Sequence, residues 1–289
     1  MTTLDAPPPT PFNFLSLGAG VQSSTIALMI ATKAIDETID GAIFSDTISE
    51  PAEVYRWLDF LEEEISESPN PFPIYRVTAG SLRDRELQLR VSGKSGKTYR
   101  KSAIPAFVKK PEGGVGIVSR KCTTDHKIIP ITKKVRELAG IKRGQKVVTV
   151  TQMIGISRDE IVRMKPSREP WCQHRWPLIE LGMRRQDCLD WMKRNGFPEP
   201  PRSACTFCPF HSDHEWQRLK QDHPKDFADA VLFEKQLQDA AKQDQAMRSI
   251  PYLHRSLVPI GEIDFTPSDK RGDGFVFDFQ SECEGLCGV

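Results

Sequence analysis

Two groups of residues in this sequence have types and spacings suited to chemistry: a glycine- and serine-rich turn and a set of widely separated cysteines. The turn, at 18–24, lies between apolar runs at 12–17 and 26–30. Glycine lets the backbone approach an anion closely, and a helix that begins at such a turn presents unpaired N–H groups and a positive dipole end. The pattern predicts either a phosphate-binding turn or a plain strand-to-helix connection.

The turn offers both backbone N–H groups and side-chain hydroxyls to a phosphate. It has neither the Gly-Lys-Ser/Thr of a Walker loop nor a clean Gly-x-Gly-x-x-Gly, so it belongs to neither common class. The candidate phosphate ligands here are Ser16, Gly18, Ala19, Gly20, Val21, Gln22, Ser23 and Ser24.

The cysteines suggest a metal or sulfur centre. Cys205 and Cys208 form a Cys-x-x-Cys pair followed by proline, and Cys122 follows two basic residues that favour a thiolate. A cuboidal iron–sulfur cluster needs three or four thiolates, and Cys283 or Cys287 near the end of the chain would supply the fourth. Zinc and a dithiol redox pair remain open as alternatives.

The zinc alternative would use two histidines that follow Cys208, namely His211 and His214, in a Cys2His2 set. The remaining cysteines differ in kind. Cys188 falls within an amphipathic helical pattern and is expected to be buried packing, whereas Cys172 is expected in a loop that faces a substrate.

The elements that must position these residues alternate between strand and helix. Apolar runs at 12–17, 40–45, 74–77 and 146–154 predict strands, and periodic segments between the first three predict helices at 21–33 and 50–65. This order is typical of a parallel sheet covered by helices. We therefore expect an α/β fold with a doubly wound, mostly parallel sheet, helices on both faces, and a helical C-terminal part.

The later segments fill in the organisation of the chain. Helices are expected at 124–139 despite Pro130, at 184–195, and at 211–243 with a break before Pro224. Phe275, Phe277 and Phe279 alternate as in a short edge strand. We divide the chain into a disordered lead-in (1–11), a nucleotide-binding domain (12–180) with a basic insertion or lid at about 91–115, a helical cysteine-containing subdomain (181–262), and a tail (263–289).

Composition limits the class of protein. The 289 residues include 38% hydrophobic and 27% charged residues, and 40 basic side chains nearly balance 39 acidic ones. Net charge therefore does not indicate a nucleic-acid binder, although a local basic patch remains compatible with one. No apolar stretch is long enough to span a membrane, and seven cysteines without a secretory leader predict a reducing, cytoplasmic location.

The turn resembles the PP-loop of ATP pyrophosphatases, in particular the phosphoadenosine-phosphosulfate (PAPS) reductase-like family. Residues 18–23 lie where that family has Ser-Gly-Gly-Lys-Asp-Ser, with Val21 and Gln22 in place of its Lys and Asp. Other segments resemble the family in the same order along the chain. They are Ser45-Asp46-Thr47, Cys122 with Lys127 and Pro130, Gly155 to Glu160 with Arg163, Trp176-Pro177-Leu178 with Asp187 and Trp191, Cys205-x-x-Cys208, and Glu282-Cys283.

The resemblance implies an adenine nucleotide alpha hydrolase-like fold that binds ATP and Mg²⁺. It implies that Asp46 and Thr47 lie near the nucleoside or metal, and that Gly155 and Arg158 face the phosphates. Cys122, Cys205, Cys208 and Cys283 would hold a [4Fe-4S] cluster. The residues expected to act in catalysis are Arg158, Lys127, Cys283 and Cys287.

The function that this resemblance implies is adenylation of an acceptor with pyrophosphate release, followed by sulfur transfer. The acceptor would be a nucleic acid, tRNA or DNA, and a sulfur-donor protein and a second copy of the chain are further expected partners. Two alternatives stay open. The first is a sulfonucleotide (PAPS or APS) reductase that uses a C-terminal cysteine, and the second is a nucleotide-binding protein without catalysis.

Overall fold

The computed structural model describes residues 9–265 except positions 119 and 248, and its centre is a five-stranded parallel sheet. The strand order is β3-β2-β1-β8-β9, and all four neighbouring pairs are parallel. The five strands are β1 (Phe12–Ser16), β2 (Gly41–Asp46), β3 (Ile74–Thr78), β8 (Val150–Ile154) and β9 (Cys172–Arg175).

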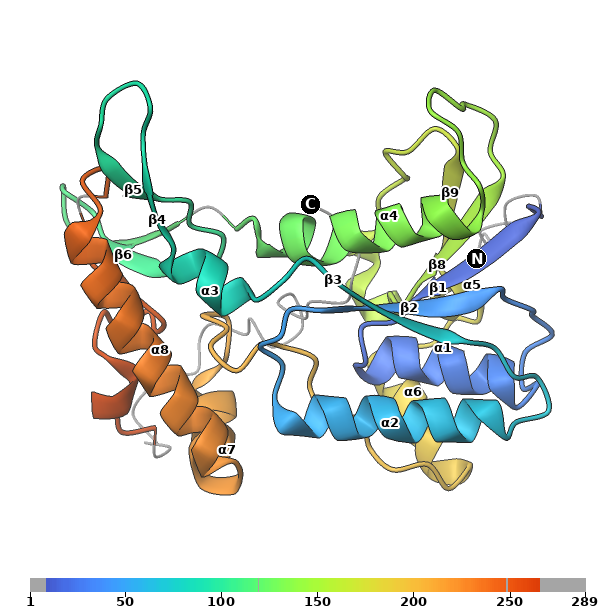
Figure 1. The fold of residues 1–289 in the computed structure, drawn as a ribbon. Coiled ribbons are helices and arrows are strands. Elements are labelled where there is room, and N and C mark those ends of the chain that lie inside the picture. Colours follow the sequence, from blue (N-terminus) through green and yellow to red (C-terminus); the bar gives the residue numbers. More distant parts are fainter. Residues whose placement is uncertain (1–8, 119, 248, 266–289) are drawn as a thin grey trace.

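Helices pack against both faces of this sheet, because successive strand residues point to opposite sides. Leu15 joins a core formed with α1 (Val21–Ala31), α2 (Ala52–Ser66) and α6 (Arg185–Arg194). Its neighbour Phe14 joins a second core with α4 (Ile129–Leu138). Figure 1 shows α1, α2 and α6 below the sheet and α4 above it. The expected α/β class with a parallel sheet is thus confirmed.

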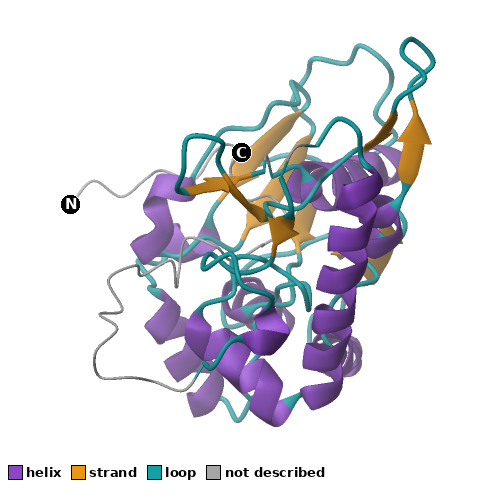
Figure 2. Ribbon diagram, turned by 90° about the vertical axis from the view of Figure 1, so that its left-hand side faces the viewer, coloured by secondary structure: helices purple, strands orange, loops and turns teal. Residues whose placement is uncertain are grey.

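The basic insertion and the C-terminal helices share a separate core. Buried residues from 82–106 pack with residues from 207–265, among them Ile104, Phe207, Trp216 and Phe233. Figure 2 looks onto this part, which lies on the left in Figure 1. Its elements are α3 (Leu82–Leu87), β4 (Leu89–Val91), β5 (Thr98–Arg100), β6 (Phe107–Lys109), β7 (Val115–Ile117), α7 (Asp213–Asp222), α8 (Pro224–Gln243), β10 (Pro251–Tyr252) and a 3₁₀ turn η3 (Ile260–Glu262).

A buried ionic network attaches the insertion to α8. Glu86 is fully buried and accepts hydrogen bonds from Ser102 Oγ at 2.6 Å and from the N–H of Ala103 at 2.7 Å. The guanidinium of Arg100 lies 3.8 Å from Glu86 and 3.7 Å from Asp244. Because an uncompensated buried charge is costly, these three groups fix the base of the insertion.

Several boundaries differ from the sequence prediction for identifiable reasons. The helix predicted through Pro130 is confirmed. It begins with a π-helical turn, η1 (Thr124–Ile128), and Pro130 lies at the start of α4, where a helix tolerates proline. The break before Pro224 is also confirmed. The strand expected from 146 begins only at Val150, since residues 146–148 are exposed.

The expectation for Cys172 is wrong, whereas that for Cys188 is confirmed. Cys172 is not in a loop: it lies in β9, an edge strand that the sequence pattern did not predict, and only 6% of it is exposed. Cys188 is fully buried in α6. The strand expected around Phe275, Phe277 and Phe279 lies outside the described residues. In the described part of the chain, no helix is both long and apolar enough to cross a bilayer.

Candidate functional site

The strand order reverses between β1 and β8, and the predicted phosphate turn lies at this reversal. The chain leaves β1 through α1 toward β2 on one side, while β8 continues toward β9 on the other. Ligands of open α/β sheets bind outside the carboxyl ends of the strands at such a point. The turn 17–20 after β1 and the segment 155–157 after β8 both lie at this edge.

The backbone of the turn leads directly into the N-terminus of α1. Ala19 has a positive φ of 59°, and Gly20 is extended directly before α1, which has no side-chain cap at its N-terminus. The first N–H groups of a helix lack intrahelical partners, and the dipole makes this end positive. The turn is itself braced, because Gly18 N–H donates to Ser23 Oγ at 3.1 Å and the Ser203 hydroxyl donates to the Gly18 carbonyl.

All three serines predicted as phosphate ligands have structural partners, and for Ser23 this is the N–H of Gly18. Ser16 Oγ accepts a hydrogen bond from Gln152 at 2.7 Å, and Ser24 Oγ accepts one from the Trp57 indole at 2.9 Å. Both serines are buried. Their hydroxyls therefore link β1 to β8 and α1 to α2, and the backbone N–H groups remain the better phosphate donors.

Gln22 joins a buried polar group that the sequence did not reveal. Its amide donates to Glu160 Oε2 at 3.1 Å and accepts from Arg185 Nη1 at 2.9 Å. Glu160 is buried and pairs with Arg163. The carboxylate is thus balanced by arginine beside the turn, and no charge pattern in the sequence distinguished it from the neighbouring acids.

Arg158 lies at the same edge, at the start of a 3₁₀ turn, η2 (Arg158–Arg163), that follows β8 and the buried Gly155. Its backbone N–H donates to the Met183 carbonyl at 2.8 Å, and its side chain is exposed. Glu160 pairs with Arg163 rather than with Arg158. Arg158 therefore lies at this edge of the sheet, and its guanidinium is accessible to a ligand.

The loop after β2 is tightly held over the carboxyl edge. Asp46 Oδ1 accepts hydrogen bonds from the Ile48 N–H at 2.7 Å and from the Tyr55 hydroxyl at 2.9 Å. Ile48 has a φ of 56°, which is rare for a β-branched residue, and 53% of it is exposed. The Ser49 carbonyl accepts from the Thr206 N–H at 2.9 Å, which ties this loop to the cysteine segment.

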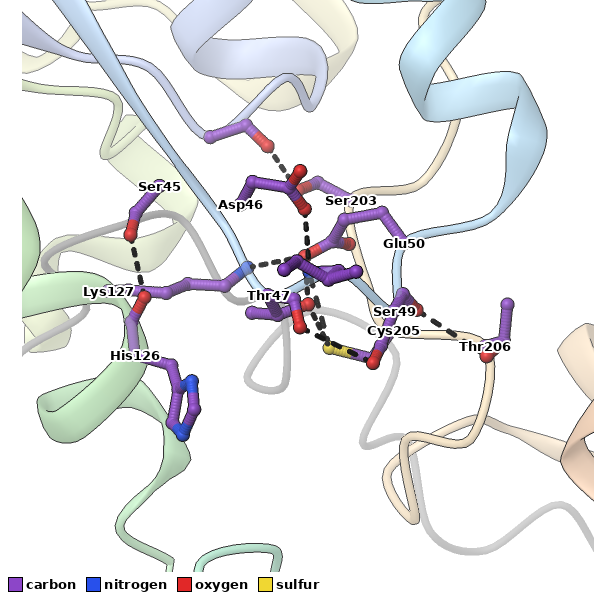
Figure 3. Close-up of polar contacts among 12 residues, drawn as sticks. Ser45, Asp46, Thr47, Ser49, Glu50, His126, Lys127, Ser203, Cys205 and Thr206 are labelled. Carbon is purple, nitrogen blue, oxygen red and sulfur yellow. Dashed lines mark hydrogen bonds and ion pairs between the residues drawn. The ribbon is translucent and has the colours of Figure 1, made fainter. Parts of the chain in front are cut away.

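A buried carboxylate, Glu50, connects the loop to the cysteines (Figure 3). Its Oε1 accepts a hydrogen bond from Thr47 Oγ1 at 3.1 Å and lies 3.5 Å from Lys127 Nζ. Lys127 is 4% exposed, so a solvated surface role for it is excluded. The sulfur of Cys205 lies 3.3 Å from Thr47 Oγ1 and 3.9 Å from Glu50 Oε1. Glu50 Oε2 is buried and has no described hydrogen-bond partner.

Cys122, Cys205 and Cys208 line one cavity, although 83 residues of sequence separate the first from the second. Apolar walls surround the thiols, and burial raises the pKa of the Cys205 thiol well above its ordinary value. The cavity also includes Thr47 and Lys127 from the neighbouring group. Its remaining lining residues are Leu82, Ile104, Pro105, Arg120, Phe207, Pro209 and Phe210.

The three thiols of this cavity and the two nearby histidines are the candidate metal ligands. Three soft thiol ligands from two chain segments match the minimum that a cuboidal cluster needs. His211 Nε2 lies 3.0 Å from the Cys205 carbonyl and its buried Nδ1 has no described hydrogen-bond partner, whereas His214 is exposed. Among the described residues of 9–265, no group of His, Cys, Asp and Glu is gathered closely enough to hold a single metal ion. Cys283 and Cys287 lie outside the described residues.

A second cavity of about 660 Å³ lies between α2, the start of α6 and α7. Arg185, which contacts Gln22, forms part of its wall, together with Arg202 and Trp57. The cavity therefore borders the phosphate turn but does not include the cysteines.

Comparisons of the chain with protein-family models, curated proteins and solved structures found no match.

Proposed function

We propose that this protein is an ATP-dependent enzyme of the PP-loop type that adenylates an acceptor, releases pyrophosphate and transfers sulfur to the activated atom. One observation carries the proposal: Thr47, expected near the nucleoside, also lines the cavity that contains the three cysteines. ATP chemistry at the sheet edge and sulfur chemistry at the thiols would therefore occur at adjoining positions.

The ATP side of the proposal rests on the edge between β1 and β8. The N–H groups at the start of α1 would bind the released pyrophosphate portion, and the exposed guanidinium of Arg158 would stabilise charge on the phosphates. Mg²⁺ bound through phosphate oxygens commonly uses one or two carboxylates. Asp46, partly exposed and hydrogen-bonded through Oδ1, fits that role.

The sulfur side rests on the cysteine cavity. Cys122, Cys205 and Cys208 would hold a [4Fe-4S] cluster, and such a cluster with three protein ligands supplies an iron position open to sulfide. The ion pair of Lys127 with Glu50 would place one pair of charged groups beside this apolar cavity, next to the nucleotide. The doubly wound, adenine nucleotide alpha hydrolase-like arrangement is part of this proposal.

The test is the fate of ATP labelled at the α-phosphate, incubated with anaerobically purified protein, sulfide and unfractionated tRNA or DNA. Appearance of labelled AMP with equimolar pyrophosphate is the expected result. A Gly20→Val variant should lose it, because a branched side chain at the start of α1 would block phosphate approach. Labelled ADP as the product, or no turnover of ATP with any acceptor, would contradict the proposal.

The same assay separates the proposal from its main alternative. The C-terminal Glu-Cys segment would favour a sulfonucleotide reductase, which would release sulfite from PAPS or APS and need no ATP. Sulfite formation without pyrophosphate would therefore identify the reductase and reject adenylation.

A further inference from the structure

The insertion is strongly basic and contains no acidic residue over a long stretch. Between Leu87 and Pro111 there are seven Lys or Arg residues and no Asp or Glu. In a chain whose overall charge is nearly balanced, this concentration is local and marks one surface.

Most of these charges point into solvent. Lys94, Lys97, Lys101, Lys109 and Lys110 are all exposed, and Lys94 and Lys97 lie in the loop that joins β4 to β5. None of the five forms an ion pair with any carboxylate in the described part of the chain, whereas Arg100 is buried and paired. Five ammonium groups are thus available to an external anion.

The base of the hairpin is fixed even though its tip is exposed. The N–H of Arg100 donates to Asp244 Oδ2 at 2.9 Å, and the N–H of Gln245 donates to the Thr98 carbonyl at 2.9 Å. Together with the buried Glu86, these bonds join β5 to the end of α8. The lysines are therefore presented on an anchored projection, which Figure 1 shows rising at the upper left.

A second basic segment rises at the other end of α4. Between Glu137 and Asp159 the sequence has no acidic residue, and Lys142, Arg143 and Lys146 are exposed in the connection from α4 to β8. In Figure 1 this connection and the β4–β5 hairpin both extend upward, on opposite sides of α4. A long polyanion could contact both projections at once.

The insertion also contributes residues to the wall of the cysteine cavity. The Ala103 carbonyl accepts hydrogen bonds from the N–H groups of Lys121 and Cys122, at 2.8 and 2.9 Å. Ile104 and Pro105 line the cysteine cavity. The segment that carries exposed lysines at one end therefore forms a wall of the thiol cavity at the other.

From this arrangement we propose that the acceptor is a nucleic acid whose phosphodiester backbone is bound by the β4–β5 hairpin and by residues 142–146. This inference rests on the proposed function, because only that function makes the bound nucleic acid an acceptor. The binding of nucleic acid to the two basic segments does not depend on it. Contacts of basic side chains with phosphates carry no base readout, so binding should be strong in low salt and weakly dependent on sequence.

The test is fluorescence anisotropy of labelled tRNA and of a labelled DNA duplex with the full-length protein, across a series of salt concentrations. The triple variant Lys94→Gln, Lys97→Gln, Lys101→Gln should weaken binding of the preferred nucleic acid at least about tenfold in low salt. It should also reduce the log–log salt slope by roughly three, at about one for each phosphate that is no longer neutralised.

The control removes the same charge elsewhere. Lys193, Lys225 and Lys235 are exposed on α6 and α8, and their triple change to Gln should leave affinity within about twofold. Melting temperatures of both variants check folding. Tighter binding of tRNA would identify RNA as the preferred nucleic acid, tighter binding of the duplex would identify DNA, and equal binding would indicate recognition of the backbone alone.

The inference would be overturned if neither nucleic acid binds in a salt-dependent manner, or if both triple variants lose affinity equally. Selective binding of an acidic protein in place of both nucleic acids would also overturn it. Pyrophosphate release from ATP is measured separately. If nucleic acid binds through the hairpin and ATP is not turned over, the proposed function fails while the binding surface stands.

Discussion

The hydroxyl of Thr47 lies 3.3 Å from the sulfur of Cys205, although 158 residues separate them in sequence. The same hydroxyl donates to Glu50 Oε1 at 3.1 Å. One small side chain therefore contacts both a buried carboxylate and a thiol of the cysteine cavity. Any ligand that displaces the Thr47 hydroxyl would alter both neighbours together.

Replacing Thr47 with valine should destabilise the protein. The change removes a donor from Glu50, whose second oxygen already has no described partner, and an unsatisfied buried acceptor costs about 1 to 3 kcal/mol. Urea denaturation of the two proteins measures the difference in free energy of unfolding. Thr47→Ser keeps the hydroxyl and should restore most of the stability; equal stability of Thr47→Val and wild type would argue against the bond.

Replacing Arg158 with alanine should weaken ATP binding without affecting the fold. Its side chain is exposed, so its removal leaves no buried partner, while the complex with ATP would lack the hydrogen bonds that a guanidinium donates to phosphate oxygens. We expect a rise in Kd of about tenfold, or about 1.4 kcal/mol, by isothermal titration calorimetry. Arg194→Ala, at the C-terminal end of α6, removes the same charge and should not change Kd; an equal rise in Kd there would indicate a general charge effect.

Serine substitutions should separate cluster ligands from packing cysteines. Changing Cys122, Cys205 or Cys208 one at a time should each remove most of the iron and sulfide after anaerobic purification, because three thiolates are the minimum for the cluster. The control is Cys188→Ala, since that thiol is buried in α6 away from the cavity. Full iron content in all three serine variants would reject the shared centre, and stoichiometric zinc without sulfide would identify the alternative metal.

The thiol of Cys172 should be unreactive at neutral pH. Burial raises its pKa to about 11, so very little thiolate exists in the folded chain at neutral pH. Peptide mapping after brief iodoacetamide treatment should find Cys172 unmodified in the native protein and modified in concentrated guanidinium chloride. Rapid native labelling of Cys172 would contradict its buried position in β9.

Stability should fall as the solution becomes acidic from neutral. Burial lowers the pKa of His126 and His174, and lowers that of His211 to about 4. These groups are therefore neutral in the folded chain, whereas the unfolded chain takes up protons below its ordinary histidine pKa of about 6.5. The unfolded state binds more protons in this range, so unfolding becomes easier as pH decreases from about 6.5 toward 4.

Urea denaturation at about pH 7.5, 6.5 and 5.5 measures this dependence across the histidine range. His174→Gln should reduce the slope, because it removes one of the three groups, while His214→Gln on an exposed side chain should leave it unchanged. An unchanged slope for His174→Gln would show that His174 does not contribute.

The sheet was predictable because its signals are local. β1, β2 and β3 are short apolar runs separated by helical periodicity, and the turn after β1 contains the glycines that mark a strand-to-helix junction. β9 was missed because its residues, Cys172 to Arg175, are polar at three positions of four. Its strand character comes from pairing with β8, which a single sequence does not display.

The candidate site was predictable only in part. The family resemblance supplied Asp46, Thr47, Arg158 and the cysteines as separate segments, and the hypothesis that Cys122 approaches the Cys-x-x-Cys pair agrees with their common cavity. Glu50 was missed, and Glu160 entered only as part of the segment 155–160, without a role of its own. Each is one acid among several neighbours in sequence, and only tertiary burial distinguishes them from solvated surface charges.

The hydrogen bond from Ser203 to the Gly18 carbonyl joins residues 185 positions apart, and Thr206 adds a second long-range link to Ser49. The loops at the sheet edge therefore reach their final conformation only after the last third of the described chain has docked. Contacts of such sequence separation slow folding, because loop closure precedes any gain from them. During synthesis the half of the chain that contains the turn 17–20 would emerge with this turn unbraced, and the proposed ATP site would be completed late, after residue 203 has left the ribosome.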